Sequence, residues 1–186
     1  MHKIRSFIAI EIEVSQKIKE LIKELEKTGI NAKIVETNNM HLTLKFLGDT
    51  DTSLLEDIEE IIKDSVKNIN PFEISLKDVG VFPNTNYIKV FWIGINDSGF
   101  LKKIASEIDE KLNKIGFKKE RREFSAHLTV ARVRSAKNKE KLIQLINKYK
   151  DTEFQKIKVE KITLKKSLLT PEGPIYTNLA EVKIGE

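Results

Sequence analysis

Two of the three histidines in this sequence open almost identical tetrapeptides. His41 begins the sequence HLTL and His127 begins the sequence HLTV, so both fit the pattern H-x-T-x. From composition alone, Leu-Thr would follow both of two given histidines with a probability of roughly 3 in 100,000. Chance is therefore a poor explanation of the repeat, and the two motifs are the first candidates for chemistry.

Each tetrapeptide has the pattern of a β-strand, in which successive side chains point to opposite faces. His41 and Thr43 then share one face, as do His127 and Thr129, while the apolar positions face a core. A lone histidine on a strand is usually a core residue satisfied by a neighbour. The duplication preserves the polar pair as well as the apolar pattern, however, which favours a site where the two polar faces meet.

Two imidazoles and two hydroxyls that face one another suit phosphodiester chemistry. One imidazole can accept a proton from a nucleophile while the other donates one to a leaving group, because both titrate near neutral pH. Threonine hydroxyls can donate hydrogen bonds to the non-bridging oxygens of a phosphoryl group. The residues thus predict a metal-free phosphodiester site, without deciding which histidine is the acid and which the base.

The composition removes several other kinds of site. The 186 residues include no cysteine, which excludes a thiol nucleophile, a disulfide framework and a zinc–thiolate site. No phosphate-binding loop signature supports the use of ATP, and we expect neither a cofactor nor a metal. The net charge of +5 fits either attraction to a polyanion such as RNA or a solvated, lysine-rich surface.

The sequence also lacks the signals of a membrane or secreted protein. No apolar run approaches the ~20 residues of a membrane span, and the N-terminal stretch has no signal-peptide cleavage site. We therefore expect a soluble, cytoplasmic monomer that does not bind membranes.

Apolar periodicity predicts the same strand–helix–strand–strand–helix–strand unit twice. Strands are expected at residues 4–12, 30–36, 40–47, 72–82, 87–95, 127–133, about 154–164 and 175–184. Helices are expected across residues 14–25 and at about 53–69, 98–115 and 138–149. No linker separates the repeats, so we predict one α+β domain, residues 1–186, with two pseudo-symmetric lobes at approximately 1–83 and 84–186. Each lobe should be a mainly antiparallel sheet with helices on its outside, and the active-site cleft should lie between the lobes.

The chain resembles a known group of enzymes at these motifs. The doubled H-x-T-x is similar to that of the two-histidine (2H) phosphoesterase superfamily. The segments RSFIAIEI, HLTLKFLG and SAHLTVARV resemble those of the RNA 2′,3′-cyclic phosphodiesterases, also named RNA 2′-5′ ligases. This resemblance covers essentially the whole chain. The resemblance implies hydrolysis of a 2′,3′-cyclic phosphate on RNA to a 2′-phosphomonoester without metal, and a reversible, ATP-independent 2′-5′ joining.

The resemblance also implies roles for single residues. His41 would donate a proton to the departing 3′-oxygen, and His127 would accept the proton of the attacking water. Thr43 and Thr129 would bind the phosphate, and Arg132 matches an arginine common in the family. Strict alternation places Arg132 on the face opposite His127, so it needs a strand end or a bulge to reach the phosphate.

Other residues near the motifs have two interpretations each. Phe7 either packs in the core or presents its ring to the terminal base. Lys45 shares the His41 face by parity, and either adds positive charge there or is solvated. The basic run at residues 118–122 either guides an RNA backbone or forms a solvated loop. Trp92 either packs in the core, which we expect, or forms a stacking platform.

Two other functions remain open from the sequence. The first is a 2H phosphodiesterase that acts on small cyclic nucleotides, 2′-5′ oligoadenylates or ADP-ribose cyclic phosphate. Comparing activity on an oligonucleotide and on a mononucleotide separates this function from the RNA enzyme. The second is a non-catalytic RNA-binding protein, which would not need paired titrating groups.

Overall fold

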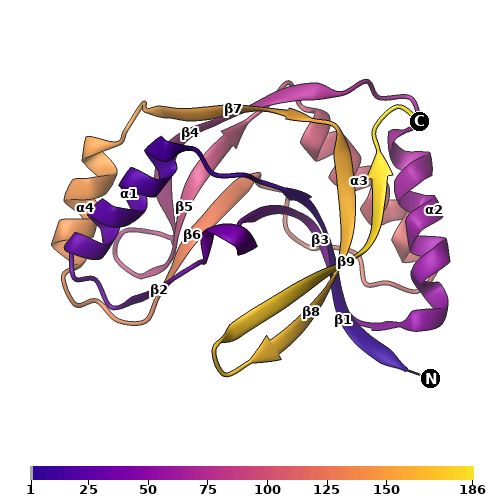
Figure 1. The fold of residues 1–186 in the computed structure, drawn as a ribbon, viewed down its shortest axis with the longest axis horizontal. Coiled ribbons are helices and arrows are strands. Elements are labelled where there is room, and N and C mark those ends of the chain that lie inside the picture. The colour runs from indigo at the N-terminus through magenta and orange to yellow at the C-terminus, as the bar shows by residue number, and fades with distance from the viewer. Residues whose placement is uncertain (1) are drawn as a thin grey trace.

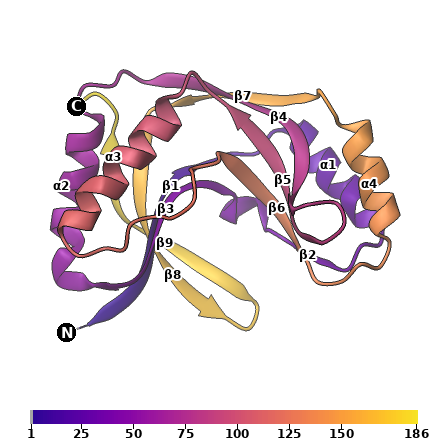
Figure 2. The same ribbon diagram turned by 180° about the vertical axis from the view of Figure 1, so that it is seen from behind.

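The computed structural model describes residues 2–186 and confirms an α+β fold (Figures 1 and 2). These residues form two antiparallel sheets and four α-helices. The first sheet has the order β3-β1-β8-β9, with β3 (His41–Asp51), β1 (Lys3–Glu11), β8 (Lys161–Thr170) and β9 (Gly173–Lys183). The second has the order β2-β6-β5-β4-β7, with β2 (Ala32–Ile34), β6 (His127–Val133), β5 (Ile88–Asn96), β4 (Phe72–Pro83) and β7 (Glu153–Val159). The helices are α1 (Gln16–Lys27), α2 (Leu55–Val66), α3 (Phe100–Lys114) and α4 (Lys139–Lys148).

Two helices cover the outside of each sheet. α2 and α3 pack together on the first sheet, α2 beside β9 and α3 beside β3, while α1 and α4 lie together at the second sheet (Figure 1). Each helix has an apolar stripe at intervals of three to four residues, and in α1 the buried positions are Ile18, Leu21, Ile22 and Leu25. Burial of these stripes forms the core and leaves the other face of each sheet for the motif histidines and the aromatic side chains around them. None of the helices within residues 2–186 is long and apolar enough to cross a membrane.

The sequence halves and the lobes of the structure differ. Strands β8 and β9 come from the second half of the chain but complete the first sheet, and β2 and β4 come from the first half but lie in the second sheet. Helix α3 likewise packs beside β3 of the other repeat. The approximate lobe halves 1–83 and 84–186 are therefore replaced by two interleaved lobes, because the repeated units exchange helices and strands.

The single strand expected at 154–164 is two strands. β7 ends at Val159 in the second sheet and β8 begins at Lys161 in the first, so the chain passes from one sheet to the other at Glu160. No glycine or proline marks this passage, which is why the periodicity of the sequence does not reveal it.

Both motif strands carry a β-bulge at the same position of the motif. The register between β1 and β3 shifts at Leu44, and the register between β5 and β6 shifts at Val130. Each bulge leaves one residue without a cross-strand partner, and the side chains beyond it change face. Leu44 and Lys45 are consequently both buried on the helix side, as are Val130 and Ala131. The backbone carbonyl of Val130 instead accepts a hydrogen bond from the amide of Val35, at 2.8 Å.

Candidate active site

The two H-x-T-x motifs begin β3 and β6, one in each sheet, and these strands lie beside each other. The first motif leucine, Leu42, is 1% exposed, and its counterpart Leu128 is fully buried. The histidine and the threonine of each motif are half-buried and lie on the opposite face of the strand. Strand alternation thus sorts each motif into a packed side and a polar side, as the sequence predicts.

Both imidazoles make the same local hydrogen bond. Nδ1 of His41 lies 2.7 Å from the carbonyl oxygen of Asn39, and Nδ1 of His127 lies 2.8 Å from the carbonyl oxygen of Ser125. A carbonyl oxygen can only accept, so Nδ1 carries the hydrogen in each ring. Each Nε2 is then the atom that can accept or donate a proton, so both rings can take part in proton transfer through the same atom.

The His41 ring is enclosed by aromatic side chains. The centroid of Phe7 lies 4.8 Å away, and the Tyr176 ring meets His41 nearly edge-on at 5.3 Å. Burial among these rings lowers the pKa of His41, and the positive charges of Lys165 and Arg132 lower it further; the hydrogen bond to Asn39 and the charge of Glu11 oppose the change. In the free protein, His41 therefore favours the neutral form more than an ordinary histidine does.

The motif strands of the two sheets lie beside each other, and the charge of Arg132 acts across them on His41. Arg132 belongs to β6 of the second sheet, whereas His41 and Tyr176 belong to the first, and the arginine charge acts on both of these side chains. The bulge at Val130 returns Arg132 to the face of His127, where the guanidinium is exposed. The bulge required by the sequence argument is thus present.

The equivalent position after the first motif holds an aromatic residue. Phe46 follows His41 by the same number of positions as Arg132 follows His127, and it too comes after a bulge. Phe46 is 64% exposed, with its ring centroid 6.2 Å from that of Phe7. The face of the first sheet thus presents a flat apolar ring where the second presents a cation. Sequence reasoning missed Phe46, because its role depends on the bulge.

The expectation for Lys45 is wrong for the same reason. The bulge at Leu44 turns Lys45 away from His41 and toward α3. Its Nζ lies 2.5 Å from Oδ1 of Asp109 and 2.8 Å from the carbonyl oxygen of Lys118. Lys45 is buried at 6% exposure, so it neither adds charge beside His41 nor is solvated.

The two other aromatic expectations have mixed outcomes. Phe7 is 3% exposed, which agrees with core packing, although its ring also contacts His41. Trp92 was expected in the core but is half-buried on the motif face, opposite Thr129 in the β5–β6 pairing. Its ring packs on Phe82, whose own ring meets His127 edge-on with centroids 5.0 Å apart. Nothing in the sequence pattern singles out Phe82, which lies far from its partner along the chain.

The basic run at residues 118–122 is exposed and leads toward His127. It has no helix or strand of its own, but its backbone is attached to the buried Lys45–Asp109 pair. Asp109 accepts hydrogen bonds from the amide of Glu120 at 3.1 and 3.2 Å, and Lys45 donates to the carbonyl of Lys118. The buried Lys45–Asp109 pair thus anchors the start of the segment that leads to the second motif at His127.

Known proteins resemble this chain along nearly its whole length. Residues 7–184 match the family described as "AKAP7 2'5' RNA ligase-like domain". A protein of Methanocaldococcus jannaschii named RNA 2′,3′-cyclic phosphodiesterase is 44% identical over 180 residues, covering 96% of this chain and 99% of the relative. A protein of Methanothermobacter thermautotrophicus with the same name is 36% identical over 179 residues, covering 95% and 97%.

Solved structures share the fold at lower identity. The protein TT0787 of Thermus thermophilus has a TM-score of 0.78 at 23% identity, covering 97% of this chain and 98% of that one. The LigT protein of E. coli, solved with 3′-AMP, has a TM-score of 0.75 at 20% identity and full coverage of both chains. A family match along nearly the whole chain, joined to these relatives, places the protein in the 2′-5′ RNA ligase-like family of 2H phosphoesterases.

Proposed function

We propose that this protein hydrolyses the 2′,3′-cyclic phosphate end of RNA to a 2′-phosphomonoester by acid/base catalysis, with no metal ion. The observation that carries the proposal is the matched pair of hydrogen bonds from Nδ1 of His41 and Nδ1 of His127 to backbone carbonyls. They leave one Nε2 on each motif face for proton transfer. The names of the relatives, RNA 2′,3′-cyclic phosphodiesterase, support the choice of substrate.

The proposed step balances as a single displacement at phosphorus. A water oxygen forms a bond to phosphorus while its proton passes to Nε2 of His127. The bond from phosphorus to the 3′-oxygen breaks, and that oxygen takes the proton from Nε2 of His41. The products are a 2′-phosphomonoester and a free 3′-hydroxyl, and solvent exchange restores the two protonation states.

The lowered pKa of His41 is compatible with its role as the acid. Burial and the charges of Lys165 and Arg132 weaken its hold on the proton, which makes the imidazolium a stronger donor. A phosphodiester anion placed beside the ring would favour the charged form while the substrate is bound. The hydroxyls of Thr43 and Thr129, with the Arg132 guanidinium, would then hold the non-bridging oxygens.

We further propose that the same site joins RNA ends. If the 5′-hydroxyl of another RNA replaces water, the same displacement forms a 2′-5′ linkage without ATP. One copy of residues 1–186 supplies both histidines from its two sheets, which supports a single domain that acts as a monomer. A cytoplasmic location remains a prediction of the sequence.

The test is an oligoribonucleotide ending in a 2′,3′-cyclic phosphate, incubated with the protein in excess EDTA. We expect a 2′-phosphate product, resolved from the 3′-isomer by chromatography. A 3′-phosphate product, or activity that EDTA abolishes and one divalent metal restores, would overturn the proposed chemistry.

A further inference from the structure

A pocket of about 390 Å³ adjoins His41 and has no role in the step above. Its wall is formed by His41 and Tyr176 together with residues from the end of β1, the start of α1 and the segment that precedes β3, among them Glu11, Lys19 and Asn38. The volume lies within the range of small-molecule sites in proteins. The pocket therefore continues the motif face beyond His41 and is large enough for part of a substrate.

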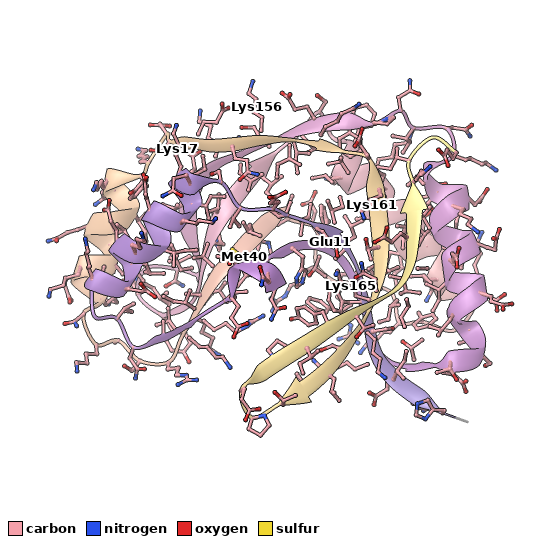
Figure 3. All side chains as sticks on the ribbon, in the orientation of Figure 1. Glu11, Lys17, Met40, Lys156, Lys161 and Lys165 are labelled. Atoms are coloured by element: carbon pink, nitrogen blue, oxygen red, sulfur yellow. The ribbon has the colours of Figure 1, made fainter. Side chains whose placement is uncertain are left out.

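A hydrogen-bonded charge network centred on the buried Lys165 forms one side of this pocket. Nζ of Lys165 donates to Oε1 of Glu11 at 2.5 Å and to Oδ1 of Asn178 at 2.7 Å, and Figure 3 labels Glu11 and Lys165 beside the strands that carry them. Lys165 is 7% exposed. An ammonium group has three N–H donors, and these two contacts occupy two of them. The cation is thus fixed at the pocket wall with capacity for one more acceptor.

The charges that line the pocket balance. Lys19 and Lys165 supply two positive charges, and Glu11 and Glu13 supply two negative ones. A site for a bare phosphate would have an excess of positive charge. Donors and acceptors in equal supply suit a nucleotide instead, because the edges of a nucleobase carry both kinds of group and its phosphate needs a nearby cation.

The chemistry of the cyclic end determines which nucleotide this is. Both ester oxygens of a 2′,3′-cyclic phosphate belong to one ribose, so the ribose lies against the histidine that protonates its 3′-oxygen. The RNA chain leaves that ribose through its 5′-oxygen, and the pocket begins at the same histidine. We propose that the pocket binds the nucleotide that precedes the cyclic-phosphate end, which makes the protein selective for RNA over mononucleotides. This inference rests on the proposed function.

The test compares kcat/KM for a 2′,3′-cyclic mononucleotide and for a dinucleotide with the same cyclic end. For the wild type we expect a preference for the dinucleotide of about tenfold or more, equivalent to ~1.4 kcal/mol. Lys19→Ala and Asn38→Ala should reduce that preference about fivefold or more, and should act through the dinucleotide alone. Lys23→Ala, on the same helix but outside the pocket, serves as the matched control and should leave both substrates unchanged.

The outcomes separate this proposal from the proposed function. Equal kcat/KM on the two substrates in the wild type, or equal losses on both in the Lys19 and Asn38 variants, would overturn the pocket assignment while leaving cyclic-phosphate hydrolysis intact. Absence of hydrolysis with both substrates would overturn the proposed function and the pocket assignment with it. Lys19 is exposed on α1, so loss of folding does not confuse the result.

Discussion

His41 and His127 hold their imidazoles in the same way, each with Nδ1 against the carbonyl oxygen two residues earlier, at 2.7 and 2.8 Å. The two rings differ in what surrounds them. His41 lies between Phe7 and Tyr176 and near two cations, whereas His127 meets the edge of Phe82. The two imidazoles share the same local geometry but have different surroundings. Different surroundings can adapt one imidazole to donate a proton and the other to accept one.

We expect Arg132 to contribute strongly to activity although its side chain is exposed. Arg132→Ala should lower kcat/KM by about 10- to 100-fold, since charge-assisted hydrogen bonds contribute ~1.5–3 kcal/mol. Arg134→Ala is the matched control, because Arg134 is also exposed and follows the end of the same strand. Steady-state kinetics on a cyclic-phosphate substrate measure both variants. Similar small effects at the two positions would show that Arg132 does not bind the phosphate of the substrate.

The ionisation of His41 should depend on the opposite sheet. We expect its pKa, followed by NMR titration of the ring, to lie below the usual histidine value of about 6.5, because burial and two cations disfavour the imidazolium. Arg132→Gln removes one cation and should raise the pKa of His41. An unchanged titration in that variant would mean that the two motif faces do not interact.

The same shift predicts a dependence of stability on pH. The pKa of His41 is lower in the folded protein than in the unfolded chain, so the neutral ring stabilises the fold above the unfolded value of about 6.5. That contribution is lost as the pH falls through the folded pKa. Urea unfolding from pH 7.5 to 5 should therefore show a smaller loss of stability in His41→Asn than in the wild type. Identical slopes for the two proteins would contradict the assigned environment.

The buried pair that anchors the basic run should be important for stability. Lys45→Met leaves Asp109 as an unpaired buried charge and should cost about 3–5 kcal/mol in the free energy of unfolding. The double variant Lys45→Met/Asp109→Leu should recover much of this loss, because it removes both charges. Lys103→Ala, exposed on the same helix, should leave the urea midpoint unchanged. A double variant no more stable than the single one would refute the pairing.

The basic run should matter more for long RNA than for short substrates. Reversing Arg121 and Arg122 to glutamate should weaken binding of a long RNA and reduce its salt dependence, by about 0.7 in log–log slope for each phosphate that the variant no longer neutralises. Dinucleotide hydrolysis should change far less. The charge-matched control replaces Lys141, in α4, and Lys150, just after α4, with glutamate. If both reversals have the same effect, the run is a solvated loop.

The sequence predicted the faces on which the motif side chains lie better than it predicted their surroundings. The motif residues could be placed because strand alternation is a local property of the chain. Lys45 and Trp92 were placed wrongly: a bulge changes side-chain parity at Leu44, and Trp92 alternates with the buried Phe91 and Ile93, so its side chain lies on the opposite face. Tyr176 and Phe82 contact the histidines through tertiary packing alone, which no pattern within one strand encodes.

The most direct test of the paired-histidine mechanism is a double-mutant comparison in excess EDTA. His41→Ala and His127→Ala should each fold, as checked by melting temperature, because their packed neighbours Leu42 and Leu128 remain. Each should lose ~10²–10⁴-fold in kcat on a cyclic-phosphate RNA. The double variant should lose much less than the product of the two single losses, because both groups serve one proton-transfer cycle. A folded single variant that retains near-wild-type turnover would contradict the mechanism.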